Sequence, residues 1–237
     1  MTERTSIKRL LISPPFGNWF NTPNATRIRG SFTWQRRRGL LYHTLRSLRP
    51  IKHGWVNQIG LRNCGIRAVQ FDPATVYSLV GLEADEWEKM LDHCPSWIIP
   101  ELNLGCPNVH EYGIPRATLA AYCAKFASVI AKLPPTDQVD DLASMCVDEG
   151  VQYLHLCNTI PTDRGGESGE RLFRLTLPIV ERIAARHGRS ITIIAGGGIY
   201  GIEQLSQYQR AGATHFSLST IWLTPWRVPS VMGWKSG

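Results

Sequence analysis

The segment ELNLGCPN, residues 101–108, joins the end of an apolar run to groups that can carry out chemistry. Asn103 and Asn108 contribute two carboxamides, Cys106 contributes a thiol, and glycine and proline fix the backbone between them. A carboxamide both donates and accepts hydrogen bonds, which suits the polar edge of a flat heterocycle. A thiolate in a polar loop can act as a base or a nucleophile, although a lone cysteine can also be an inert small hydrophobe. The segment therefore predicts a site that presents amide and thiol groups to a planar ligand.

Two further strand ends carry polar residues that suit such a site. Lys132 lies at the end of an apolar run in IAKL, and Asn158 and Thr159 follow the apolar run YLHLC. A lysine at the end of a buried strand is costly unless it is paired, so we expect its ammonium to face an anionic ring or a phosphate. A surface lysine and turn-capping asparagines are the alternative interpretations.

Glycines and hydroxyl residues at the last two strand ends predict a phosphate site. The glycines at 196–198 stand before a predicted helix, and Ser219 and Thr220 end the following strand. Backbone N–H groups with no side chains in front of them, at a helix N-terminus, can bind phosphate. Phosphate sites after the seventh and eighth strands recur in (β/α)8 barrels. The turn GGESG at 165–169 is expected to add further donors ahead of another helix.

Strands and helices alternate from about residue 75 onward. We expect strands at 75–81, 97–104, 129–133, 151–158, 190–198 and 214–220, and two more at 10–13 and 30–33. We expect helices at 83–94, 137–150, 169–188 and 201–212, and one that begins at 117 and runs into the strand at 129–133. Residues 14–70 read mostly as loop.

This alternation is typical of parallel strands joined by crossover helices. Eight strands, with polar or glycine-rich residues at nearly every carboxyl end, predict one compact (β/α)8 TIM barrel over residues 1–237. Little chain remains after Thr220 for a full last helix, so that helix is expected to be truncated. A doubly wound open sheet is the alternative architecture.

Composition excludes several classes of protein. The chain has 237 residues, of which 43% are hydrophobic, which is enough for a packed core. No run of about 18 apolar residues is present, so no transmembrane segment is expected, and the N-terminus does not read as a secretory signal. The six cysteines form no C-x-x-C pair, which argues against a metal site and a disulfide framework and favours a reducing, cytoplasmic location.

Charge is unevenly distributed along the chain. Residues 1–70 hold 13 Lys or Arg and one acid, Glu3, whereas the whole chain has a net charge of +7. Such asymmetry can mark a surface for an anionic partner, either RNA, an anionic membrane or an acidic protein. The alternative is a solvated basic surface with a few phosphate contacts, because no RNA-binding motif accompanies the charge.

Several motifs together resemble those of the dihydroorotate dehydrogenases, a family of FMN-dependent barrel oxidoreductases. In chain order they are GSFT…RRRG at 30–39, GWVNQIGLRNCGI at 54–66, ELNLGCPN at 101–108, AKLPP at 131–135, NTIPTDRGGESG at 158–169, AGGGI at 195–199 and AGATHFSLSTIW at 211–222. They span nearly the whole chain in the order of the family. The resemblance implies an enzyme that oxidises dihydroorotate to orotate in pyrimidine biosynthesis.

The same resemblance implies which residues form the site. FMN would bind through Gly30, Ser31, Asn103, Lys132, Asn158, Gly169, Gly196, Gly197, Gly198, Ser219 and Thr220. The substrate ring would meet Asn57, Gly60, Leu61, Asn103, Asn108, Asn158 and Thr159. Cys106 would remove a proton from C5 of dihydroorotate while hydride leaves C6 for flavin N5, and Lys132 would stabilise negative charge on the reduced flavin.

One departure from the family concerns the substrate carboxylate. Family members usually carry a lysine near it, in the loop after the first strand, but this loop reads SPPFGNW here. Asn18 is the nearest polar residue in the loop, and Arg27 or Arg29 are the other candidates for its role.

Two alternative functions stay open at this point. A dihydrouridine synthase is also an FMN barrel with an N-x-GCP loop, and it would use the basic first third of the chain to bind tRNA. A trimmed, non-catalytic homologue would keep the fold without the reaction. The sequence leaves the electron acceptor open among fumarate, NAD and quinone. It leaves the oligomeric state open as well, with a homodimer as one candidate because barrel oxidoreductases often pair.

Overall fold

A computed structural model describes residues 7–105 and 113–234 of the chain. Eight strands form a closed parallel barrel, which confirms the predicted (β/α)8 fold. They are β1 (Leu10–Ile12), β2 (Ala25–Phe32), β5 (Thr75–Leu79), β6 (Ile99–Asn103), β7 (Ile130–Leu133), β8 (Tyr153–Leu156), β11 (Thr192–Gly196) and β12 (His215–Leu218). Around the barrel their order is β1-β12-β11-β8-β7-β6-β5-β2, so the first and last strands pair and close it.

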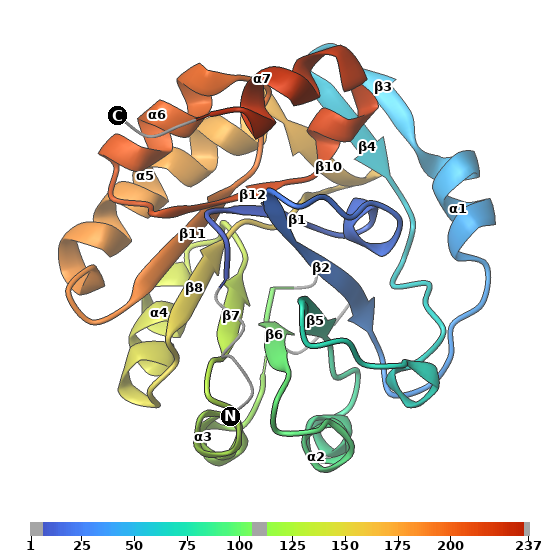
Figure 1. The fold of residues 1–237 in the computed structure, drawn as a ribbon, viewed down its shortest axis with the longest axis vertical. Helices are drawn as coiled ribbons and strands as arrows, with labels where there is room; N and C mark the ends of the chain where they lie inside the picture. Colours follow the sequence, from blue (N-terminus) through green and yellow to red (C-terminus); the bar gives the residue numbers. More distant parts are fainter. Residues whose placement is uncertain (1–6, 106–112, 235–237) are drawn as a thin grey trace.

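Helices alternate with these strands and lie around the outside of the barrel (Figure 1). They are α2 (Ala84–His93), α3 (Arg116–Lys125), α4 (Val139–Asp148), α5 (Glu170–His187) and α6 (Ile202–Arg210). After β12 the chain forms only the 3-10 helices η3 (Thr220–Leu223) and η4 (Pro225–Arg227) and the short α7 (Val228–Met232). The predicted truncation of the last helix is therefore observed.

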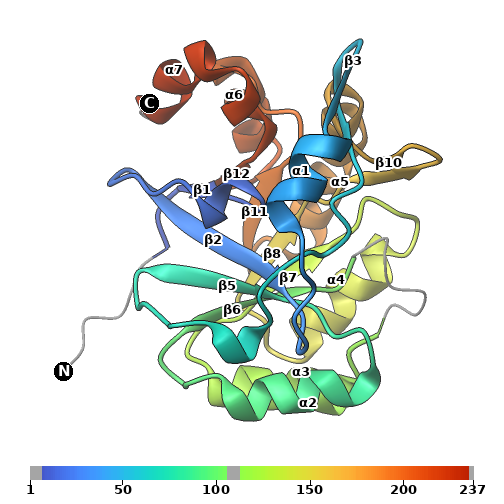
Figure 2. The ribbon, with the colours of Figure 1, turned by 90° about the vertical axis from the view of Figure 1, so that its right-hand side faces the viewer.

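A second, four-stranded antiparallel sheet stands beside the barrel. Its strands are β3 (Arg49–Ile51), β4 (Gly54–Asn57), β9 (Ile160–Thr162) and β10 (Gly165–Gly169), in the order β3-β4-β10-β9. The helix α1 (Leu40–Ser47) precedes β3, and two 3-10 turns, η1 (Phe16–Asn18) and η2 (Ile66–Ala68), complete the elements. Figures 1 and 2 both show α1 and this sheet together on one side of the barrel.

Two expectations about this region are wrong. Residues 14–70 are not mostly loop, and β2 begins at Ala25 rather than at residue 30. The arginines in TRIR interrupt the apolar pattern of β2, but Arg27 is held at the strand edge by Asp72 and Thr75, at 2.8 Å each. GGESG directly precedes a helix, α5, as expected, but it forms a strand of its own, β10, because it pairs with β4, whose residues lie far away in the sequence.

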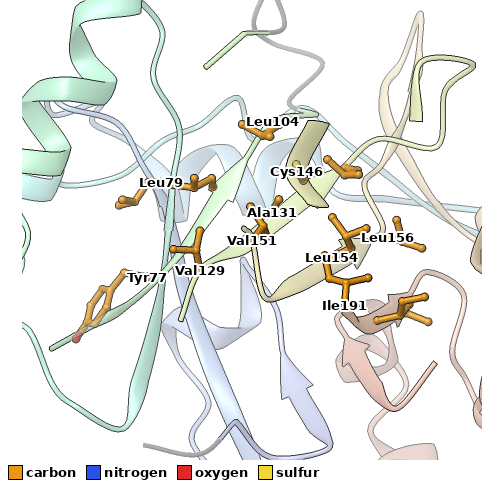
Figure 3. Packing of buried hydrophobic residues seen from close by; sticks show 14 of the residues in the cluster. Tyr77, Leu79, Leu104, Val129, Ala131, Cys146, Val151, Leu154, Leu156 and Ile191 are labelled. Atoms are coloured by element: carbon orange, nitrogen blue, oxygen red, sulfur yellow. The ribbon is translucent and has the colours of Figure 1, made fainter. Parts of the chain in front are cut away.

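The strands separate two apolar layers. The large outer core lies between barrel and helices and includes Tyr77, Leu79, Ala131, Leu154 and Leu156 (Figure 3). Side chains alternate along a strand, so the residues between these point into the barrel. The inner apolar cluster consists of Leu11, Ile28, Val76, Ile99, Ile130 and Ile194, which fill one end of the barrel interior.

Polar residues replace this aliphatic layer one step further along the same strands. Two positions after the inner aliphatic residues come Ser13, Gly30, Ser78, Glu101, Lys132 and Gly196, and the matching positions of β8 and β12 hold His155 and Ser217. The barrel interior is therefore apolar at the amino ends of its strands and polar towards their carboxyl ends, where sites form in this fold.

Candidate functional site

A cavity of about 510 Å³ lies at the carboxyl ends of the barrel strands, within the size range of small-molecule and cofactor sites. Residues from the barrel, from α1 and from the loop after β4 line it. The predicted site residues that line it are Gly30, Ser31, Asn57, Gly60, Leu61, Asn103, Lys132, Asn158, Thr159, Gly197, Gly198, Ser219 and Thr220. Lys132 and the glycines after β11, which come from different strands, therefore share one cavity.

Two of the predicted site residues that the structure describes do not line the cavity. Gly169 and Gly196 lie behind it: the carbonyl oxygen of Gly169 sits below Gly198, and that of Gly196 accepts a 2.8 Å hydrogen bond from the Tyr208 hydroxyl. Cys106 and Asn108 fall outside the described residues, so their roles stay predictions.

Several lining residues were not predicted from the sequence. They are the apolar side chains of Phe16, Trp19, Leu40, Leu41, Leu45 and Leu48, together with Arg62 and Cys157. The repeated leucines of GLLYHTLRS were the available signal for α1, because they recur at the spacing of one helix face. Burial raises the pKa of the Cys157 thiol to about 11, so this cysteine is neutral near pH 7 and unsuited to act as a base.

An amide network forms the floor of the cavity. The Asn158 side-chain N–H group donates to Asn103 Oδ1 at 3.1 Å and to the Gly105 carbonyl at 2.6 Å. Asn103 Nδ2 in turn donates to Ser31 Oγ at 3.0 Å, and that oxygen lies 2.9 Å from Ser78 Oγ. Both asparagines are more than nine-tenths buried. The network fixes their orientation, so each presents only its remaining hydrogen-bonding positions to a ligand.

Lys132 is an unpaired cation on the same floor. It lies between Asn103 and His155 in the strand register, and its ammonium makes no hydrogen bond or ion pair within residues 7–105 and 113–234. Its charge helps to lower the pKa of Glu101 and of His155 beneath it. A half-buried ammonium without a partner is available to bind an anionic ligand.

A buried acid and base lie directly below this floor. Glu101 and His155 are completely buried in the barrel interior, and His155 Nδ1 lies 2.7 Å from Glu101 Oε2. Burial lowers the pKa of His155. Although burial opposes it, the hydrogen bonds from His155 and Ser78 and the positive charge of Lys132 keep the pKa of Glu101 below its ordinary value. The pair is therefore best described as a carboxylate that accepts the Nδ1–H of a neutral imidazole.

Two histidines with lowered pKa values, His155 and His215, predict a loss of stability in mild acid. The folded-state pKa values of His155 and of His215 are both lowered by burial from 6.5, so the unfolded chain takes up protons that the folded chain does not. As pH falls from 7 to 5, we expect the free energy of unfolding to fall by up to about 1.4 kcal/mol per pH unit for each histidine. Urea denaturation at pH 7, 6 and 5 measures this slope.

The variant His155→Gln removes one of the two groups and should flatten the slope. The matched control is His93→Gln, which changes an exposed histidine and should keep the wild-type slope. Equal slopes for wild type and His155→Gln would contradict the assignment of His155 as a buried neutral base.

The far end of the cavity fits the phosphate of FMN. Gly197 and Gly198 adopt φ values of 94° and 64°, and a Cβ atom at Gly198 would lie 2.5 Å from the Gly169 carbonyl oxygen. No hydrogen-bond acceptor for the N–H groups of these two glycines occurs in the described part of the chain. Free backbone donors beside Ser219 and Thr220 suit a phosphate, and the unpaired Lys132 suits an electron-rich ring. The residues present therefore fit FMN.

Comparison with curated proteins finds dihydroorotate dehydrogenases. The chain is 24% identical over 216 residues to the catalytic subunit of dihydroorotate dehydrogenase B (NAD(+)) from Geobacillus sp. (strain WCH70), covering 76% of this chain and 68% of that protein. It is 28% identical over 203 residues to the subunit of the same name from Geotalea uraniireducens (strain Rf4), covering 70% and 66%. The aligned part thus spans about two thirds of these relatives. No protein-family model matches the chain.

Comparison with solved structures agrees on the fold. A crystal structure of DHODH from Eimeria tenella in complex with ferulenol superimposes with a TM-score of 0.71 at 15% sequence identity, covering 94% of this chain and 79% of that one. The ligand-free DHODH of the same organism gives a TM-score of 0.70 at 16% identity. The resemblance expected from the motifs is confirmed in sequence and in fold. In the described part of this chain, no helix has the length and apolar character needed to cross a membrane.

Proposed function

We propose that this chain, a relative of the dihydroorotate dehydrogenases in sequence and in fold, oxidises dihydroorotate to orotate with FMN, as a step of pyrimidine biosynthesis. One observation carries the proposal: the amide floor, the unpaired Lys132 and the glycine turn after β11 line one cavity. A cavity with amides for a ring, a cation for an electron-rich cofactor and free N–H groups for a phosphate matches this reaction.

FMN supplies the acceptor for the hydride that leaves C6 of the substrate. Gly197 and Gly198 would hold its phosphate with Ser219 and Thr220, and Lys132 would lie beside its ring. Asn103 and Asn158, already oriented by hydrogen bonds to each other, would bind the amide and carbonyl groups of the substrate ring.

The proton at C5 of the substrate needs a base. Cys106 stands three positions after Asn103, which is part of the amide floor. The family resemblance assigns the role of the base to Cys106. Cys157, the lining cysteine within the described residues, is excluded as the base because its pKa is raised to about 11. Loss of the C5 proton to Cys106, together with loss of the C6 hydride to the cofactor, would convert dihydroorotate to orotate.

The visible spectrum of the purified protein tests this proposal. We expect a yellow protein whose flavin band bleaches when dihydroorotate is added without oxygen. Cys106→Ala should keep the band but bleach at least about 100-fold more slowly, because the base is missing. Cys64→Ala, which changes an exposed cysteine, is the matched control and should bleach like wild type.

The other outcomes separate the alternatives. A colourless protein, or a yellow one that dihydroorotate does not bleach, would favour a non-catalytic homologue. Reduction of uridine in tRNA, with binding that weakens steeply with salt, would favour a dihydrouridine synthase. Rapid bleaching of Cys106→Ala would remove Cys106 from the mechanism.

The wider setting of the protein also stays a proposal. We infer a cytoplasmic location, a homodimer and an anionic partner for the basic first third of the chain. Its arginines include Arg36 and Arg38, which are exposed beside the start of α1.

A further inference from the structure

Arg62 is the second cation of the cavity. Among the described residues that line the cavity, Lys132 and Arg62 are the two that carry a positive charge, and none is an aspartate or a glutamate. Lys132 lies at the end of β7, on the floor of the cavity. Arg62 lies in the loop after β4, which lines a different part of the cavity wall. The two cations therefore belong to different parts of the wall and can serve different groups.

The guanidinium of Arg62 has no partner among the described residues. Its Nε atom is buried and makes no hydrogen bond, and Arg62 takes part in no ion pair in the described ranges 7–105 and 113–234. The residue as a whole is only partly buried and lines the cavity, where none of the described lining residues is a carboxylate. The charge of the guanidinium is therefore available to pair with an anionic ligand inside the cavity.

The loop that carries Arg62 is held rigidly. Leu61 adopts a φ of 54°, a left-handed conformation that costs energy for a residue other than glycine. Asn63 maintains it: its Nδ2 donates to the Leu61 carbonyl at 2.7 Å, and its Oδ1 accepts from Gly65 N at 2.7 Å. The Asn63 backbone also pairs with that of Arg37. Strain that is maintained in this way is typical of a binding loop.

Among the described residues, the loop after β1 offers no cation for the same purpose. Pro14, Phe16 and Trp19, which follow β1, line the cavity. The Asn18 carboxamide is already used, because its Nδ2 donates to the Gly30 carbonyl at 3.0 Å and its Oδ1 accepts from the Gly30 N–H at 2.9 Å. The two arginines considered from the sequence do not line the cavity. Arg27 pairs with Asp72 at 2.8 Å, and the Arg29 guanidinium lies over the Phe32 ring at 5.9 Å.

We propose that Arg62 binds the carboxylate of the substrate and thereby replaces the lysine that the loop after β1 lacks. The inference rests on the proposed function, since the anion is the carboxylate of a pyrimidine ring held on the amide floor. Arginine suits this group because its planar fork can donate two parallel hydrogen bonds to one carboxylate. Arg62 is thus a specificity-determining residue that selects rings bearing a carboxylate.

Orotate and uracil are the probes that test this assignment, because uracil is the same ring without the carboxylate. Binding to the purified flavoprotein is followed by the shift of the flavin absorption band, which needs no turnover. Arg62→Met should weaken orotate binding roughly 10- to 100-fold, the range expected for hydrogen bonds to a charged group. It should leave uracil binding and flavin content unchanged. Arg62→Lys should recover part of the orotate affinity.

Arg67→Met is the matched control, since it removes an exposed arginine five positions along the chain that bonds to Gln35 instead of facing the cavity. Wild-type orotate affinity in Arg62→Met would overturn the role of Arg62 and leave the proposed function intact. If Arg62→Met does not fold, equal orotate affinity in Arg62→Lys and wild type would overturn the bidentate contact. A wild-type protein that holds flavin but binds no orotate would overturn both proposals.

Discussion

Replacing Lys132 with methionine is expected to remove most of the flavin from the purified protein and to slow reduction of the remainder at least about 100-fold. Methionine keeps much of the side-chain volume but removes the charge. Lys132 has no partner among the described residues, so its ammonium is free for the cofactor, and its loss leaves negative charge on the reduced cofactor without a counter-charge. Flavin content comes from the absorbance spectrum, and reduction is followed by stopped flow with dihydroorotate in the absence of oxygen.

Lys89→Met is the matched control for this experiment. Lys89 lies on α2, where it forms an exposed ion pair with Asp85, four positions earlier, and such pairs contribute little. It should keep wild-type colour and wild-type reduction. A Lys132→Met protein as yellow and as quickly reduced as wild type would contradict a role for this lysine at the flavin.

Replacing His155 with leucine is expected to lower the free energy of unfolding at pH 7 by about 3 to 5 kcal/mol, because the buried carboxylate of Glu101 loses its hydrogen-bond donor. The double variant Glu101→Leu with His155→Leu should recover more than half of that loss, since two leucines can pack against the aliphatic layer below. Chemical denaturation of the wild type, both single variants and the double variant gives the coupling energy directly. Additive losses in the double variant would show that the two residues do not act as a pair.

The barrel itself could be predicted from the sequence, because local patterns carry the information. Short β-branched runs separated by amphipathic segments mark each strand and helix, and the carboxyl ends of parallel strands must meet at one edge. Lys132 and the glycines at 196–198 could thus be placed at one rim without knowing any tertiary contact.

The small sheet beside the barrel could not be predicted in the same way. GGESG has no apolar pattern, and it becomes a strand only because Gly54–Asn57, more than 100 positions earlier, pairs with it. The position of α1 could not be predicted either. Its leucines have the spacing of a helix face, but their place at the cavity depends on the path of the chain after β2.

The buried pair was missed although its signal was present. Glu101 stands two positions before Asn103, and His155 stands two positions before Cys157, so both share the inward face of their strands. An acid in one buried strand and a histidine in the next-but-one strand predict a buried pair once strand order is known. Strand order follows from the closed barrel, so this prediction needs the fold as well as the sequence.

The aliphatic layer at the amino ends of the strands closes that end of the barrel interior. Glu101 and His155 lie between this layer and the amide floor and are completely buried. Each is therefore shielded from solvent on both sides by the chain itself.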